Sequence, residues 1–119
     1  MITWFESHLQ SERFASAARD FLRRGNEAKA QELFVQAAIA EEQALERISP
    51  DRTTTLGVIA MSASALWLRA KRVEDAARVA RVLLRIPELL PLAQRHLIAV
   101  NAALRRANKT LIPVPSLCY

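Results

Sequence analysis

The sequence contains little of what builds β-sheets, disulfide frameworks or membrane spans. Its 119 residues include two glycines and one cysteine, Cys118, and only 6% are aromatic. A single cysteine cannot form a disulfide within the chain, and runs of aromatic and β-branched residues are too scarce for a sheet protein. The longest uncharged stretch, at 53–68, is too short and too rich in serine and threonine to span a bilayer. The opening residues MITWFESHLQ lack the features of a secretory signal, so we expect a cytoplasmic protein.

The sequence also lacks the residue patterns on which enzymes are commonly built. It has no glycine-rich phosphate loop and no Ser/His/Asp or Cys/His arrangement, and Glu41 and Glu42 would point about 100° apart on a helix. His8 and Glu12 share a helix face without a third ligand at a suitable spacing, so we expect a solvated His8 and no metal or cofactor. His96 is expected among packed residues. We therefore predict a protein without enzymatic activity.

Alanine and other hydrophobic residues dominate what is present. Hydrophobic residues make up 51% of the chain and recur at helical spacing. The sequence predicts an all-α domain at 1–108 with about five helices, at residues 4–24, 27–47, 54–70, 73–86 and 91–107. A proline-containing tail at 109–119 follows. It either folds back through Leu111, Ile112, Leu117 and Tyr119 or extends freely.

The periodicity also predicts which side of each helix is buried. In the first helix the predicted inner residues are Phe5, Leu9, Phe14, Ala17, Ala18 and Phe21. In the fifth they are Leu92, His96, Ala99, Ala103 and Leu104. On the exposed face of the fourth helix, Glu74 and Arg78 have the spacing of a favourable ion pair.

The stretch RRGNEAKA at 23–30 decides between one long helix and two antiparallel ones. Gly25 suits the left-handed residue that ends a helix, and Arg23 and Arg24 precede it at the negative end of the helix dipole. Asn26 is a good first cap for the next helix. The stretch therefore predicts the turn of a helical hairpin.

Glu41 falls in the middle of the apolar stripe of the second helix. An unpaired carboxylate costs several kcal/mol to bury, so Glu41 must find a partner or project beyond the packed region. Arg52 and Arg69 are the candidate partners, and a buried Glu41–Arg52 ion pair is one interpretation. A solvated Glu41 on an overhanging helix end is the other.

Residues 11–44 resemble the 34-residue tetratricopeptide repeat. Gly25 stands at the turn, Phe14 and Phe21 at aromatic positions of the first helix, and Ala30, Phe34 and Ala37 at the small, aromatic and small positions of the second. Residues 57–90 resemble a second, degenerate unit, with Lys71 where the turn glycine is expected. The segments AAIAEEQAL (37–45), SPDR (49–52) and SASALW (62–67) are also similar to small bacterial helical proteins of uncharacterised role.

The resemblance implies a right-handed superhelix of two hairpins with a capping fifth helix. It also implies a non-enzymatic interaction scaffold that holds a peptide or helix of a partner protein in a groove. Mapped by position, the groove-facing residues include Arg19, Arg23, Ser62 and Arg69, and the three arginines suit an acidic partner.

The uneven charge of the chain leaves two alternatives open. Residues 1–46 carry a net charge of −3 and residues 47–119 one of +8. A basic stripe of Arg78, Arg81 and Arg85 would suit nucleic acid, although no recognisable reading motif accompanies it. Self-association as a homodimer is the second alternative, with Trp4 and Phe5 at an exposed edge.

Overall fold

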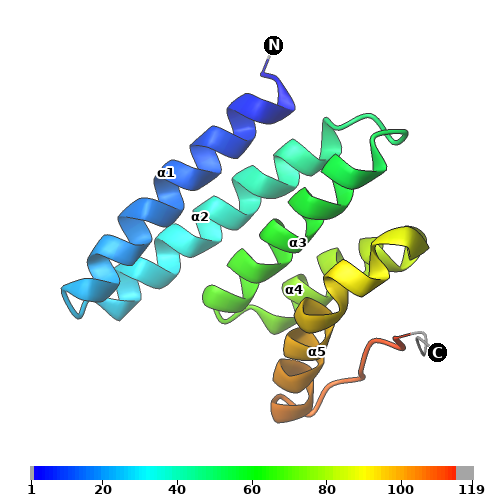
Figure 1. Cartoon of the computed structure of the whole chain (residues 1–119). Helices are drawn as coiled ribbons and strands as arrows, with labels where there is room; N and C mark the ends of the chain where they lie inside the picture. Colours follow the sequence, from blue (N-terminus) through cyan, green and yellow to red (C-terminus); the bar gives the residue numbers. More distant parts are fainter. Residues whose placement is uncertain (1, 115–119) are drawn as a thin grey trace.

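The structure is a computed structural model that describes residues 2–114, and within this range all regular structure is helical (Figure 1). Five α-helices, α1 (Trp4–Arg23), α2 (Glu27–Glu46), α3 (Thr53–Arg69), α4 (Val73–Ala80) and α5 (Leu90–Arg106), are joined by short turns. Two 3₁₀ segments, η1 (Arg81–Arg85) and η2 (Pro87–Leu89), separate α4 from α5. The predicted all-α architecture and four of the five predicted helices are confirmed to within about a residue.

The fourth predicted helix is the exception, because its α-helical part ends at Ala80. The chain continues as 3₁₀ turns to Arg85, and Ile86, the residue before Pro87, then leaves the helical region with φ −127° and ψ 73°. Proline lacks a backbone N–H and cannot continue a helix. The predicted helix over 73–86 is therefore wrong in its second half.

The hairpin turn at Gly25 is confirmed in detail. Thr3 caps α1 by accepting the Glu6 backbone N–H at 3.1 Å, and α1 ends before Gly25, whose φ of 79° lies in the left-handed region. Asn26 then caps α2 by accepting the Lys29 backbone N–H at 3.1 Å. Local chemistry alone thus defines both helix ends.

The same turn recurs after α3 and α5. Lys71 and Asn108 have φ values of 61° and 59°, and each turn repeats the hydrogen bonds made around Gly25. In each turn, the N–H of the left-handed residue donates to the carbonyl three residues earlier. The N–H of the following residue donates to the carbonyl five residues earlier than itself. Every second helix therefore ends in one motif, although only the first turn has glycine.

Small side chains line the contact between α1 and α2. The buried residues of α1 are Ser7, Ser11, Ala15 and Ala18. They meet the buried alanines of α2, and the Ser11 hydroxyl donates to the Ala37 carbonyl at 2.8 Å. The predicted burial of Phe5 and Leu9 is wrong, because these side chains are 52% and 37% exposed. Small residues let the two backbones approach closely, and the larger side chains lie outside the seam.

The inner face of α5 also differs from the prediction. Its buried residues are Leu90, Ala93, Leu97, Val100 and Leu104, whereas Leu92 is 64% exposed. Both sets have helical spacing, and packing against α3 and α4 selects between them. Near the start of α5, Leu89 packs against the backbone of Gly57 in α3, where a side chain would collide with it.

The chain after α5 folds back along the helices. Ile112 is buried, and the side chain of Asn101 in α5 forms hydrogen bonds with both backbone groups of Ile112. Asn101 Oδ1 accepts the Ile112 N–H at 2.8 Å, and Asn101 Nδ2 donates to the Ile112 carbonyl at 3.0 Å. We call residues 109–114 the C-terminal strap. Cys118, Leu117 and Tyr119 lie outside the described residues.

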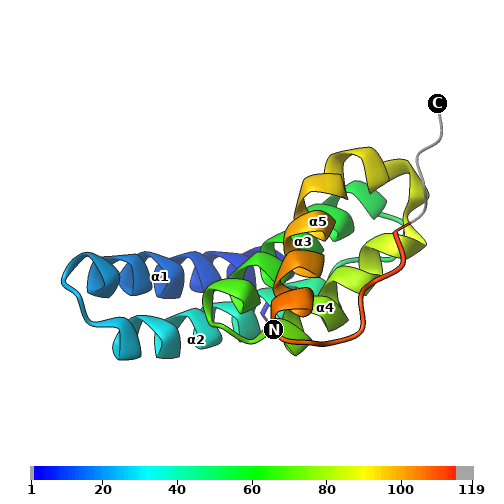
Figure 2. The ribbon, with the colours of Figure 1, turned by 90° about the horizontal axis from the view of Figure 1, so that it is seen from below.

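The molecule is flat, with principal extents of 45 × 38 × 20 Å. Successive helices pack side by side, with α1 at one end and α4 and α5 at the other (Figures 1 and 2). Within residues 2–114 no helix combines the length and apolar character needed to cross a membrane. The overall arrangement leaves α1 packed mainly on α2 and exposes one side of the α1–α2–α3 layer as a groove.

Candidate functional site

The groove lies between α1 and α3, with α2 as its floor. Two adjoining hollows, of about 400 and 240 Å³, are lined by one face of each helix. The α1 residues are His8, Ser11, Glu12, Ala15, Ser16, Arg19 and Leu22; the α2 residues are Glu27, Ala30, Gln31, Phe34 and Glu41; the α3 residues are Ser62, Leu66 and Arg69. Because α1 and α3 run in the same direction and α2 opposes both, the hollows follow one another. We call them together the α1–α3 groove.

The hollow nearer the start of α1 is polar, and Glu41 forms its floor. This carboxylate is 1% exposed. Nδ1 of His8 lies 2.9 and 3.0 Å from its two oxygens, and the Ser62 hydroxyl donates to Oε2 at 2.6 Å. Nε2 of His8 faces Glu12 Oε1 at 3.3 Å. Glu41 thus joins α1, α2 and α3 through one carboxylate, and we call this hollow the polar hollow.

These contacts correct two predictions. His8 is not a solvated residue, because it is partly buried and bound to Glu41. The predicted Glu41–Arg52 pair is replaced by His8 and Ser62, since Arg52 lies over the Trp4 ring at 5.6 Å. Arg69, the other candidate partner, lies over the Phe34 ring at 5.5 Å. Glu41 is buried rather than overhanging.

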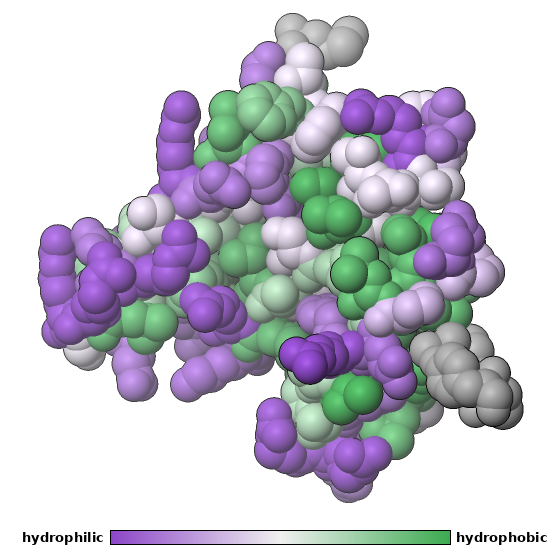
Figure 3. All heavy atoms as spheres, viewed as in Figure 1, coloured by the Kyte–Doolittle hydropathy of each residue, from purple (hydrophilic) through white to green (hydrophobic). Residues whose placement is uncertain are grey.

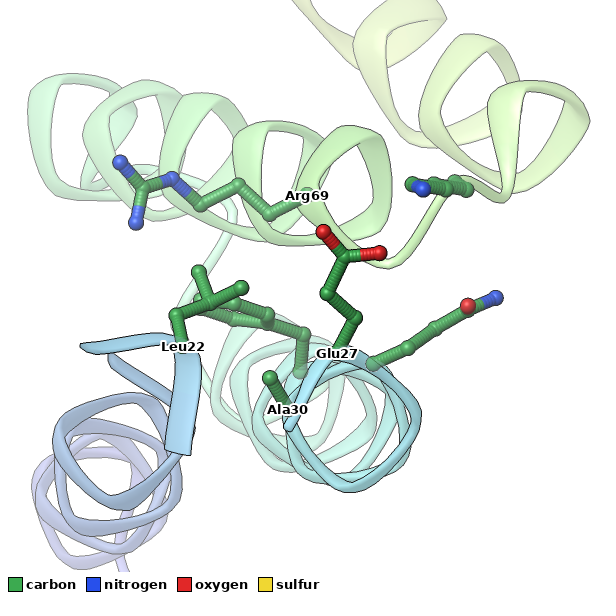
Figure 4. A pocket seen from close by; sticks show the side chains of 7 residues that line it. Leu22, Glu27, Ala30 and Arg69 are labelled. Carbon is green, nitrogen blue, oxygen red and sulfur yellow. The ribbon is translucent and has the colours of Figure 1, made fainter. Parts of the chain in front are cut away.

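The second hollow, near the Gly25 turn, is apolar and we call it the apolar hollow. Phe34 and Ala30 are buried at its base, and Leu22 forms an exposed wall. Figure 4 shows Leu22 at the end of α1, Ala30 and Glu27 on α2, and the side chain of Arg69 extending along α3 toward Leu22. Lys71, in the left-handed turn after α3, completes the lining.

The predicted groove residues divide between these hollows. Arg19 and Ser62 line the polar hollow and Arg69 lines the apolar one. Arg23 lines neither, because its guanidinium is ion-paired with Asp20 on the exposed side of α1. The structure thus brings three of the four residues to one groove.

Glu42 forms a second junction that the sequence reasoning missed. Its carboxylate accepts the Trp67 indole N–H at 2.6 Å and two Arg78 N–H groups at 2.8 Å each. Arg78 also donates to Asp75 at 3.1 Å, and hydrogen bonding to Glu42 raises the pKa of Arg78. The 100° separation of Glu41 and Glu42 was the available signal, because it directs them to different neighbours.

The basic stripe is therefore weaker than its sequence suggests. Arg78 is held by Glu42 and Asp75, while Arg81 and Arg85 lie on the 3₁₀ segment after α4. The predicted Glu74–Arg78 pair is wrong, because Glu74 binds Lys109 of the C-terminal strap at 2.6 Å.

The polar hollow contains serine, histidine and glutamate, but not in a catalytic order. The Ser62 hydroxyl and His8 Nδ1 both bind the Glu41 carboxylate, so among the described residues the two do not form the serine–histidine hydrogen bond of a Ser/His/Asp arrangement. Among residues 2–114 no three His, Cys, Asp or Glu side chains gather as metal ligands. Elsewhere, the buried Nε2 of His96 has no hydrogen-bond partner, and burial lowers the pKa of this imidazole. The geometry of the groove suits binding.

Comparison of the chain with protein families, with curated proteins and with solved structures finds no match.

Proposed function

We propose that this chain is a non-enzymatic interaction scaffold whose α1–α3 groove binds a peptide segment of a partner protein. The observation that carries the proposal is the groove itself, three helices wide and open to solvent. Its cations Arg19, Arg69 and Lys71 form no ion pair among the described residues. These free positive charges favour a partner segment that carries carboxylates.

We propose in addition that the helices have a tetratricopeptide-like organisation, which would suit the same function. Gly25 and Lys71, which the sequence comparison aligned, both occupy left-handed turns, and each precedes the second helix of a hairpin. The groove-lining α1 and α3 are the first helices of the two units. In our proposal α5 and the C-terminal strap cap the array.

The length of the groove limits the size of its occupant. From His8 to Leu22 the groove follows fourteen residue steps of α1, or about 21 Å. An extended segment of about six residues covers that distance. A short linear segment is therefore sufficient.

Selection from a phage-displayed random dodecapeptide library on the immobilised protein tests this function. Enriched peptides would be synthesised and titrated into the isotope-labelled protein. We expect chemical-shift changes concentrated at groove residues such as Arg19, Phe34 and Ser62. Peptides that perturb another surface, or a selection that enriches none, would refute the proposal.

A matched pair of variants provides the control. Arg19→Ala changes an exposed groove arginine and should weaken the selected peptides. Arg95→Ala changes an exposed arginine of α5 outside the groove and should not. Equal effects would indicate attraction by overall charge alone.

The alternatives have weaker support. Arg78, the first residue of the basic stripe, is ion-paired with Glu42 and Asp75. Apolar and hydrophilic side chains alternate over the face shown in Figure 3. The exposed Ile2, which precedes α1, and the exposed Phe5 and Leu9 of α1 supply on the order of 300 Å² of apolar surface. A stable dimer buries about 800 Å² per partner, so this patch is too small by itself.

A further inference from the structure

Resting on the proposed function, we propose that the groove recognises an extended segment by a charge pattern. An apolar side chain next to an acidic residue binds at the apolar hollow, and a basic residue four to five positions away binds beside Glu12. The two hollows have opposite chemistry, and this difference gives the occupant an orientation.

The apolar hollow accepts one side chain. Its volume of about 240 Å³ equals roughly eight water molecules at about 30 Å³ each, enough for one leucine or phenylalanine side chain. Ala30 and Phe34 provide a buried apolar base and Leu22 a wall. Burying a leucine there removes apolar surface of both partners from water.

Cations border this hollow on the α3 side. Arg69 keeps its guanidinium over Phe34, which positions its N–H groups at the rim, and Lys71 extends from the following turn. Glu27 extends from α2 toward the same end of α3 (Figure 4), so the formal charge of the lining is two positive and one negative, or +1. A carboxylate adjacent to the inserted side chain would meet Arg69 by charge-assisted hydrogen bonds.

The polar hollow has the opposite preference. Glu41 and Glu12 contribute two carboxylates and Arg19 one guanidinium, so the formal charge of the lining is −1. Glu12 is the accessible carboxylate, at 65% side-chain exposure. From Glu12 to Leu22 is ten residue steps of α1, or about 15 Å, which four to five extended residues span. A basic side chain at that spacing reaches Glu12 while the apolar anchor enters its hollow.

This pattern favours an extended segment over a helix. A docked amphipathic helix needs a row of apolar anchors at positions i, i+3, i+4 and i+7, which is about two turns. The groove offers one apolar hollow. The rest of its lining is mostly polar, and Ala15 and Leu66 are the apolar residues among His8, Ser11, Glu12, Ser16, Arg19, Glu41 and Ser62. One anchor with polar neighbours matches the groove better than a continuous apolar stripe.

Two capped hexapeptides test the pattern: acetyl-Lys-Ser-Ser-Ser-Leu-Asp-amide and the peptide with the reverse sequence. Both are needed because the positions of the two hollows do not determine in which direction the peptide backbone runs. Each is titrated into the isotope-labelled full chain and followed by NMR. We expect one of them to shift the signals of Leu22, Phe34 and Arg69. Replacing its leucine by serine, or its aspartate by asparagine, should weaken binding at least fivefold.

Protein variants identify the contacts independently. Arg69→Gln and Leu22→Ser change exposed side chains and should each weaken binding about fivefold, whereas Arg95→Gln should leave it unchanged. Glu12→Gln should weaken the lysine-containing peptide but not a version with serine in place of lysine. Groove binding that ignores the leucine and the aspartate, or no shift with either peptide, overturns this inference. The library selection decides the proposed function separately, because it requires groove binding but no particular pattern.

Discussion

At the scale of single residues, the buried carboxylate of Glu41 depends on hydrogen-bond donors from its neighbours. It is buried between three helices, and it is compensated by hydrogen bonds from His8 and Ser62 and not by an arginine. A buried acceptor of this kind stabilises the fold only while its donors are present. Its removal leaves the donors facing the polar hollow, where water can reach them.

We therefore expect Glu41→Ala to lower the free energy of unfolding by about 2 kcal/mol. Glu41→Gln should cost about half as much, because its side-chain oxygen still accepts from Ser62. Urea denaturation measures both. The control is Glu12→Gln, which changes the exposed partner of His8 and should stay within about 0.5 kcal/mol of the wild type. Equal stabilities for all three variants would show that Glu41 has no structural role.

The left-handed turns allow a paired prediction. Gly25→Val forces a β-branched residue to a φ of 79° and should destabilise by more than 1 kcal/mol, although no atom crowds the new side chain. Lys71→Gly relieves the same strain at a φ of 61° and should stabilise by about 1 kcal/mol. Thermal and urea unfolding report the two signs. Changes of the same sign would contradict the backbone explanation.

His96 gives the stability a pH dependence. Burial lowers the pKa of His96 in the folded chain, so the unfolded chain takes up a proton first as the pH falls below the ordinary value of 6.5. This contribution is fully present above pH 6.5 and is lost below it. His96→Gln cannot titrate and should lose less stability than the wild type between pH 7.5 and 5.5. Parallel pH curves from urea unfolding would refute this account.

At the scale of elements, the C-terminal strap depends on one amide. Asn101 satisfies both backbone groups of Ile112, which a helix or sheet would otherwise satisfy. Asn101→Ala should release the strap, increase hydrogen exchange at residues 109–114 and lower the free energy of unfolding by about 1 kcal/mol. Leu111→Ser, which changes an exposed strap residue, should leave both unchanged. A strap that stays protected in Asn101→Ala is held chiefly by other contacts.

The helices could be predicted from sequence because their ends depend on local chemistry. Gly25 and Asn26 act on neighbours within four residues, and both have the predicted role. Thr3 caps α1 in the same local way. Their buried faces were harder to predict in an alanine-rich chain. Small residues form apolar stripes on more than one side, and only packing selects between them.

Only part of the candidate site could be predicted from the sequence. The positions of Arg19, Ser62 and Arg69 in the predicted repeat had placed them at a groove. The junctions at Glu41 and Glu42 depend on His8 and Arg78, which lie 33 and 36 residues away in the chain. Spacing along one helix cannot identify partners at that separation.

At the scale of the whole molecule, contacts follow the order of the chain. The α1 helix packs chiefly on α2, whereas α3 contacts α2, α4 and α5. Local opening of α1 thus breaks fewer interactions than opening of α3. Native-state hydrogen exchange should give α1 amides a lower opening free energy than α3 amides. Equal values for the two helices would indicate a fully cooperative unit.

The contacts of the two adjacent carboxylates, Glu41 and Glu42, also fix the rotation of α2 about its own axis. Glu41 faces α1 and α3, and Glu42 faces α3 and α4. A one-residue insertion between Asn26 and Glu41 would turn both side chains by about 100° relative to the start of the helix and break both junctions. An insertion in the 47–52 loop would disturb neither. Length variation that preserves this fold should therefore concentrate in that loop and spare α2.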